Sequence, residues 1–130
     1  MGSRGAWLLE PYSDSPESTG LNTTTPESIS ETAAWAIDND FQLCVHAIGD
    51  RAIRSAFDAL QIARETNGKH DNRHHISHIQ LLSPADIPRF VELGGVANFQ
   101  PLWAIEDGYI TDLTIPRIGE ERGKLLYPIG

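Results

Sequence analysis

The fold is decided by the sequence FQLCVHAIGD, residues 41–50, in which a short apolar run ends in His46 and leads through a loop into a helical pattern. The segment HHISHIQLLS, residues 74–83, repeats this arrangement around His78. Short apolar strands that alternate with amphipathic helices predict an α/β fold with a parallel sheet. Because successive parallel strands lie about 4.8 Å apart, we expect His46 and His78 to be able to hold one divalent ion, with zinc the first candidate.

Three helices are predicted around these strands. The first should span residues 25–39, because Thr25 is a capping residue and proline follows it at the first helical position. The second should run from a cap at Asp50 to the Asn-Gly pair at 67–68, and the third from Ser83 to the glycines at 94–95. Three apolar side chains of the third helix are expected to face the sheet: Ile87, Phe90 and Val91.

A third strand is predicted over residues 96–100, with Asn98 and Gln100 on one face and Phe99 on the other. Ligand sites of α/β proteins lie at the carboxyl ends of the parallel strands, so Gln100 and the nearby Trp103 are the candidates for substrate contact, with packing of the loop as the alternative role. We assign no catalytic residue.

The remaining histidines and the single cysteine receive structural roles. We expect His74 to share the face of His78 and to pack or form a hydrogen bond, His75 to point to the helix-covered side, and His70 to lie in a polar loop. Cys44 shares the strand face of His46, so it could line the pocket, but we expect it to be a small buried apolar side chain.

Several motifs resemble the amidohydrolase superfamily. The strings His46–Ile53, Arg73–Gln80 and Asn98–Pro101 are similar to that family in the same order, and the opening residues 2–12 look like its branch of N-substituted formamide deformylase-like metal-dependent hydrolases. The resemblance runs along nearly the whole chain. It implies hydrolysis of carbon–nitrogen bonds in non-peptide amides or cyclic amides, with a small amide-type molecule as substrate.

The resemblance also implies a (β/α)8 TIM-type barrel, in which the strands of this chain would be about the fifth to the seventh and His46 and His78 would be metal ligands. The family pattern further uses a His-x-His pair on the first strand, often a lysine on the fourth and an aspartate on the eighth, and neither the His-x-His pair nor the aspartate has a match here. Ser77 stands where many relatives carry glutamate. We therefore expect a fragment that is inactive alone.

Length agrees with a partial barrel. A barrel of this type needs at least about 200 residues, and the chain has 130. We therefore interpret residues 1–130 as part of a metal-dependent amidohydrolase barrel domain, with a loop over the strand ends at 1–24 and helix–strand repeats at 25–130. Open strand edges recruit partners, so we expect self-association or pairing with the rest of a barrel.

Two alternatives stay open. One is a non-catalytic fragment that binds metal weakly or not at all. The other is a small α/β binding domain, in which free N–H groups at the Gly49–Asp50 helix start hold an anion.

Composition narrows the range of partners. The net charge of -8 argues against binding to nucleic acid or to an anionic membrane, because both require clustered Lys and Arg. A single cysteine cannot form an internal disulfide, and the sequence has no apolar stretch long enough for a membrane span or signal peptide. These features predict a cytoplasmic protein.

Overall fold

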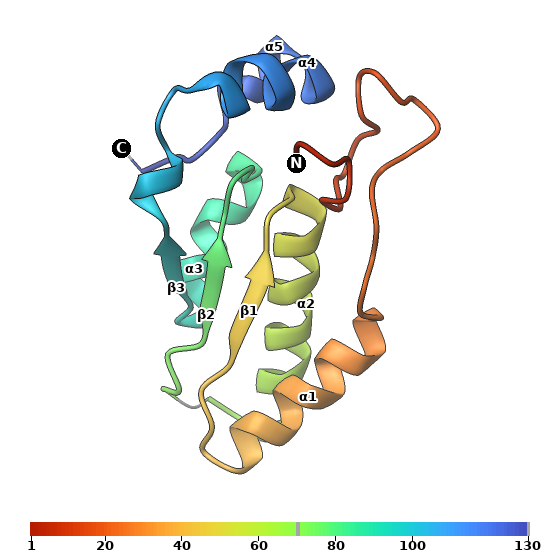
Figure 1. Cartoon of the computed structure of the whole chain (residues 1–130). Helices are drawn as coiled ribbons and strands as arrows, with labels where there is room; N and C mark the ends of the chain where they lie inside the picture. Colours follow the sequence, from red (N-terminus) through yellow and green to blue (C-terminus); the bar gives the residue numbers. More distant parts are fainter. Residues whose placement is uncertain (70, 130) are drawn as a thin grey trace.

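Three parallel strands form the centre of the fold: β1 (Cys44–Ala47), β2 (His75–His78) and β3 (Val96–Phe99), in the order β1-β2-β3 (Figure 1). The computed structural model describes residues 1–69 and 71–129. The sequence-based prediction of an α/β fold with a parallel sheet is confirmed. Each strand is connected to the next through a helix, which is the connection that parallel neighbours require.

The first two helices begin and end close to the predicted positions. In α1 (Pro26–Asp38), the Thr25 side chain accepts a hydrogen bond from the Ser28 amide at 3.2 Å. The helix α2 (Asp50–Asn67) ends at Gly68, whose φ of 83° lies in the region that favours glycine.

The predicted capping role of Asp50 is wrong. Gly49 is the capping residue of α2, and Asp50 is the first residue of the helix. The Asp50 Oδ1 atom instead accepts hydrogen bonds of 2.9 Å from the amides of Leu9 and Arg51. Asp50 therefore ties the N-terminal segment to the start of α2.

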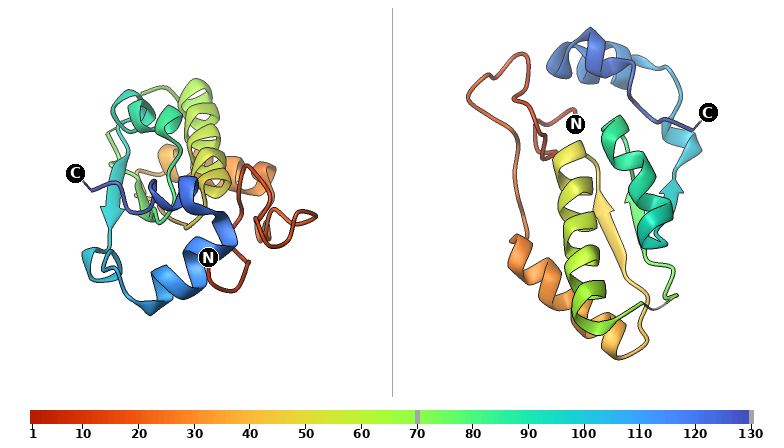
Figure 2. Two further views of the ribbon diagram at one scale, coloured as in Figure 1. Left: turned by 90° about the horizontal axis from the view of Figure 1, so that it is seen from above. Right: turned by 180° about the vertical axis from the view of Figure 1, so that it is seen from behind.

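The helices α2 and α3 (Ile87–Leu93) cover one face of the sheet, and α1 packs beside α2 (Figure 2). The rings of Phe57 in α2 and Phe90 in α3 meet edge to face, with centroids 4.7 Å apart. The core beneath the helices contains the fully or nearly fully buried residues Ala47, Ile53, Ala56, Phe57, Ile76, Ile79 and Leu82. In the described part of the chain no helix covers the other face of the sheet (Figure 1).

The third helix is shorter than predicted. A 3-10 turn, η1 (Pro84–Asp86), precedes α3, and Gly94 ends it with a φ of 68°. The prediction that Ile87 and Val91 face the sheet is wrong, since both are exposed. The predicted Phe90 does pack against the core, together with Leu93. Asp86 and Arg89 form ion pairs with α2, so the other two apolar residues turn away from the core.

Irregular segments lie over the end of the sheet to which the strands point (Figure 1). Residues 1–24 contain no helix, and their side chains Met1, Leu8 and Tyr12 are buried against Leu81 and Ile118. After β3 come four short elements: η2 (Pro101–Trp103), η3 (Tyr109–Thr114), α4 (Ile115–Ile118) and α5 (Glu120–Gly123). No helix in residues 1–69 and 71–129 is long and apolar enough to cross a membrane.

Candidate metal centre

The structure brings the two predicted ligands together. His46 lies in β1 and His78 is the last residue of β2, and their rings meet at an angle of 66° with centroids 4.3 Å apart. His46 is exposed and His78 is half-buried, so a ligand can approach the pair from solvent. The two imidazoles lie at the carboxyl ends of neighbouring parallel strands, where α/β proteins bind ligands.

Burial and then the nearby His46 lower the pKa of His78, while a side-chain hydrogen bond with Gln100 acts in the opposite direction. His78 is therefore neutral at pH 7, which is the form in which imidazole binds a metal. The same hydrogen bond joins the predicted residue Gln100 to the histidine pair. Trp103 lies in η2 with an exposed side chain, so its contact with a substrate stays a prediction.

A row of three polar side chains crosses the sheet beside the histidines. Asn98 donates a hydrogen bond of 3.2 Å from Nδ2 to the Ser77 Oγ atom, which lies 3.1 Å from the Cys44 Sγ atom. The prediction of a buried Cys44 is wrong, because it is exposed on the face without helices. We did not predict this row, although the strand alternation that places Cys44 with His46 was a signal for it.

Neither of the other two histidines that the structure describes joins the pair. His74 is buried and its Nδ1 atom accepts a hydrogen bond of 3.0 Å from the Leu43 amide, which confirms the predicted structural role. The predicted orientation of His75 is wrong: it is in register with Cys44 and therefore lies on the face without helices. His70 lies outside the described residues.

The pair supplies part of a metal-binding set. Across residues 1–69 and 71–129, no group of three or more His, Cys, Asp or Glu side chains is placed to hold a metal ion. Catalytic zinc sites use three protein ligands and structural sites use four. Two neutral imidazoles side by side fit a divalent ion, but they require further donors to complete its coordination.

The alternative of an anion at the start of α2 finds two of the helix-start amides already bonded. The Arg51 amide donates to Asp50 Oδ1, and the Ala52 amide donates to the Trp7 carbonyl oxygen at 3.3 Å. A Cβ atom at Gly49 would lie 2.1 Å from the same Trp7 oxygen, so the N-terminal segment is pressed directly onto the helix start. Neither amide is free to bind an anion.

A cavity of about 470 Å³ lies along β1, between this strand, α1 and the N-terminal segment. Trp7, Asn22 and Ile29 line it from the outside, and Cys44 and His46 line it from the strand. Because β1 is an edge strand among the described residues, the cavity follows the open edge of the sheet.

Comparison with known proteins identifies relatives over almost the whole chain. The model of the Amidohydrolase family matches residues 1–130. The chain is 34% identical over 122 residues to Protein LONG AFTER FAR-RED 3 of Arabidopsis thaliana, covering 94% of this chain and 20% of that protein. It is 29% identical over 127 residues to the putative amidohydrolase YtcJ of Bacillus subtilis, covering 98% and 23%.

Two solved structures share the fold. An uncharacterized metal-dependent hydrolase from Pyrococcus furiosus matches with a TM-score of 0.81 and 32% identity, over 97% of this chain and 25% of that one. Another uncharacterized metal-dependent hydrolase, from Pyrococcus horikoshii, matches with a TM-score of 0.78 and 31% identity, over 97% and 24%. The chain thus spans about a fifth to a quarter of the length of these relatives.

Proposed function

The chain belongs to the amidohydrolase family, and we propose that it contributes His46 and His78 to the metal centre of a hydrolase that cleaves carbon–nitrogen bonds. The observation that carries this proposal is the contact of the two rings, 4.3 Å apart between centroids, at the ends of adjacent parallel strands. Zinc is the proposed ion, because it accepts imidazole nitrogen readily and binds in sites of mixed donors.

Each residue of the centre has a proposed role. A divalent ion at this position would make hydroxide available at neutral pH and polarise the bond to be cleaved. His46 and His78 would donate ring nitrogens to it. Gln100, through its hydrogen bond with His78, would fix the orientation of that ring, as partners of metal-bound histidines commonly do.

The substrate class is the finer part of the proposal. We propose an N-substituted formamide or a related non-peptide or cyclic amide, on the basis of the resemblance of residues 2–12 to the branch of N-substituted formamide deformylase-like hydrolases. Gln100 and Trp103 are the proposed substrate contacts. Trp103 is exposed within reach of solvent, as a side chain that meets an incoming ligand must be.

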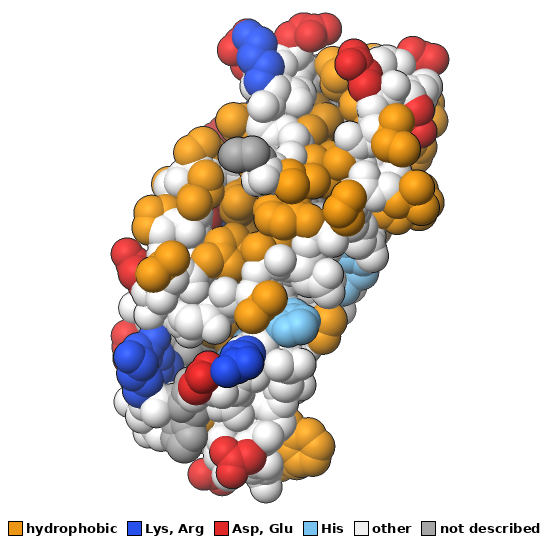
Figure 3. All heavy atoms as spheres, turned by 90° about the vertical axis from the view of Figure 1, so that its left-hand side faces the viewer, with side chains coloured by type: hydrophobic (Ala, Val, Ile, Leu, Met, Phe, Trp, Pro, Cys, Tyr) orange, Lys and Arg blue, Asp and Glu red, His pale blue; other side chains and the backbone are white. Residues whose placement is uncertain are grey.

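We also propose that the three strands are about the fifth to the seventh of a closed barrel, and that their open edges pair with other strands. Both β1 and β3 are edge strands among the described residues. The cavity along β1 leaves space for an additional strand. Figure 3, which views the side of the molecule where β3 lies, shows apolar side chains in a broad band, and exposed apolar residues include Leu102 and Ile105.

Metal binding tests the proposal directly. The purified chain is loaded with zinc, freed of excess metal and analysed by mass spectrometry, and its affinity is measured by competition with a chromophoric chelator. The double variant His46→Ala/His78→Ala should lose the bound zinc. The control His75→Ala removes a histidine from the same face and should keep it; equal zinc in the double variant and the wild type would contradict the assignment.

Activity is expected only with the missing donors in place. Because the described histidine pair gives two of the three protein ligands that a catalytic zinc requires, the chain alone should show little turnover of N-acyl or formamide substrates. Robust turnover by the chain, abolished in His78→Ala, would show that the pair suffices.

A further inference from the structure

The backbone at the end of β2 has an uncommon conformation. His78 has a φ of 80° and Ile79 a φ of 49°, so two consecutive residues other than glycine lie in the left-handed region. This region is unfavourable for L-residues, and for a β-branched residue such as isoleucine it is a true outlier. Such a conformation persists only where the surroundings impose it, and it is concentrated at functional sites.

The strand register shows what this conformation does. His78 is paired with Ala47 on one side and with Phe99 on the other, and both neighbours pack into the core beneath the helices. In a regular strand, residues in register point to the same face. A regular β2 would therefore direct His78 into the core, away from His46.

The observed ring lies on the opposite face. The His78 ring contacts the ring of His46. His46 is in register with Ser77, and the Ser77 side chain forms hydrogen bonds with Cys44 and Asn98 on the face without helices. A change of φ from the extended to the left-handed region rotates the side chain and the onward chain together about the N–Cα bond, so the ring leaves the side of the strand that an extended residue would give it. The left-handed conformation thus transfers the His78 ring from the core side to the histidine pair.

Ile79 is the residue that holds this conformation in place. Its side chain is fully buried in the cluster with Ala47 and Ile53, and its amide donates to the Ala47 carbonyl oxygen at 3.1 Å. Two residues later the Leu81 amide donates to the Ile48 carbonyl oxygen at 3.0 Å. The core position that His78 would occupy in a regular strand is filled by Ile79.

We propose that Ile79 is a positioning residue of the metal centre: its burial in the core beneath α2 holds His78 in a left-handed conformation that aims the imidazole at His46. The part of this inference that concerns metal rests on the proposed function. The part that concerns the contact between the two rings does not.

The test compares Ile79→Ala with Ile53→Ala. Both isoleucines are fully buried in the same cluster, so each variant removes similar core volume, but Ile53 lies in α2 and is not the chain neighbour of His78. Ile79→Ala should lower zinc affinity at least about tenfold, the size of effect seen when a residue that orients a ligand is lost. Ile53→Ala should stay within about threefold of the wild type.

A second readout needs no metal. Nuclear Overhauser contacts between the ring protons of His46 and His78 should be present in the wild type and in Ile53→Ala and absent in Ile79→Ala. Retention of the contacts in Ile79→Ala, their loss in both variants, or their absence from the wild type would each overturn the inference. If the wild type shows the contacts but binds no zinc, the proposed function fails and the ring-contact result alone decides the role of Ile79.

A second pair of variants, with smaller substitutions, tests the inference if Ile79→Ala does not fold. Ile79→Val removes one methyl group and keeps the branched side chain, with Ile53→Val as its control. Weaker ring contacts in Ile79→Val than in Ile53→Val support the positioning role, and equal contacts in the two variants refute it.

Discussion

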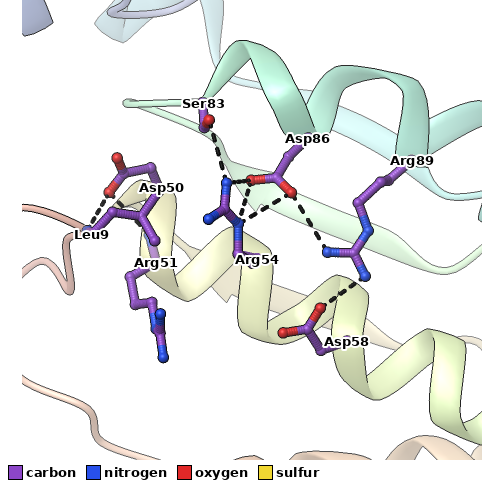
Figure 4. A network of polar contacts seen from close by, with 8 residues as sticks. All are labelled: Leu9, Asp50, Arg51, Arg54, Asp58, Ser83, Asp86 and Arg89. Carbon is purple, nitrogen blue, oxygen red and sulfur yellow. Dashed lines mark hydrogen bonds and ion pairs between the residues drawn. The ribbon is translucent and has the colours of Figure 1, made fainter.

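Replacing Asp86 with alanine should destabilise the protein strongly, because this carboxylate joins α2 to the turn that follows β2. The Asp86 side chain is 4% exposed and lies between two arginines (Figure 4). Arg54 Nη2 lies 2.9 Å from Asp86 Oδ2 and Arg54 Nε lies 3.0 Å from the same oxygen. Arg89 Nη1 approaches Oδ1 at 3.5 Å, while its Nη2 atom pairs with Asp58 at 2.8 Å.

The expected loss of stability in Asp86→Ala follows from the burial of the carboxylate. Removing one partner of a buried ion pair costs about 3–5 kcal/mol, because the other charge stays desolvated. The Arg54 side chain is 32% exposed and can regain part of its hydration, so we expect a loss of about 2–4 kcal/mol for Asp86→Ala. For a domain of this size, a loss of about 3 kcal/mol lowers the melting temperature by about 10 °C.

Asp58→Asn is the matched control. Asp58 pairs with the same Arg89, but its side chain is 58% exposed, and exposed pairs contribute about 0–1 kcal/mol. Urea unfolding followed by tryptophan fluorescence and circular dichroism gives both values. A loss below about 1 kcal/mol in Asp86→Ala, or equal losses in the two variants, would refute the argument from burial.

Three further predictions concern the N-terminal segment, a buried histidine and the sheet edges. Burial raises the pKa of Asp50, although its carboxylate accepts hydrogen bonds from the amides of Leu9 and Arg51. Asp50→Asn keeps an acceptor, so its free energy of unfolding should stay within about 1 kcal/mol of the wild type, whereas Asp50→Ala leaves the Leu9 amide unpaired and should lose about 1–3 kcal/mol. Urea titrations measure both losses, and equal losses would show that the hydrogen bond is unimportant. Burial lowers the pKa of His74 below its ordinary 6.5, so the unfolded chain takes up the proton at a higher pH than the folded chain. The free energy of unfolding should therefore fall as the pH drops from 6.5 through the folded-state pKa, by at most about 1.4 kcal/mol per pH unit for one proton. In His74→Asn this contribution to the loss of stability between pH 7.5 and 5.5 should vanish, and an unchanged pH dependence would contradict the prediction. The open edges of β1 and β3 should make the isolated chain self-associate at micromolar concentration, and light scattering coupled to size exclusion would disprove this by finding a stable monomer.

The sequence by itself determined the order of the helices and strands and the pairing of His46 with His78 at the strand ends. Local rules suffice there: Thr25 and Pro26 mark a helix start, Gly68 and Gly94 end helices, and the runs around Val45 and Ile76 form strands that need helices between them. His46 and His78 were predictable as neighbours, because parallel strands place equivalent ends side by side.

Only the tertiary structure decided how the side chains are directed. Alternation counted from His78 places His75 on the helix-covered side, but the register of β2 with β1 fixes His75 on the face of Cys44. Alternation also does not explain why the His78 ring lies on the face without helices, which depends on the left-handed residues and on the burial of Ile79. Ile87 and Val91 are exposed because Phe90 and Leu93 form the side of α3 that packs against the core, while Asp86 and Arg89 form ion pairs with α2. Such choices depend on contacts between segments far apart in the chain, and no local pattern of residues contains them.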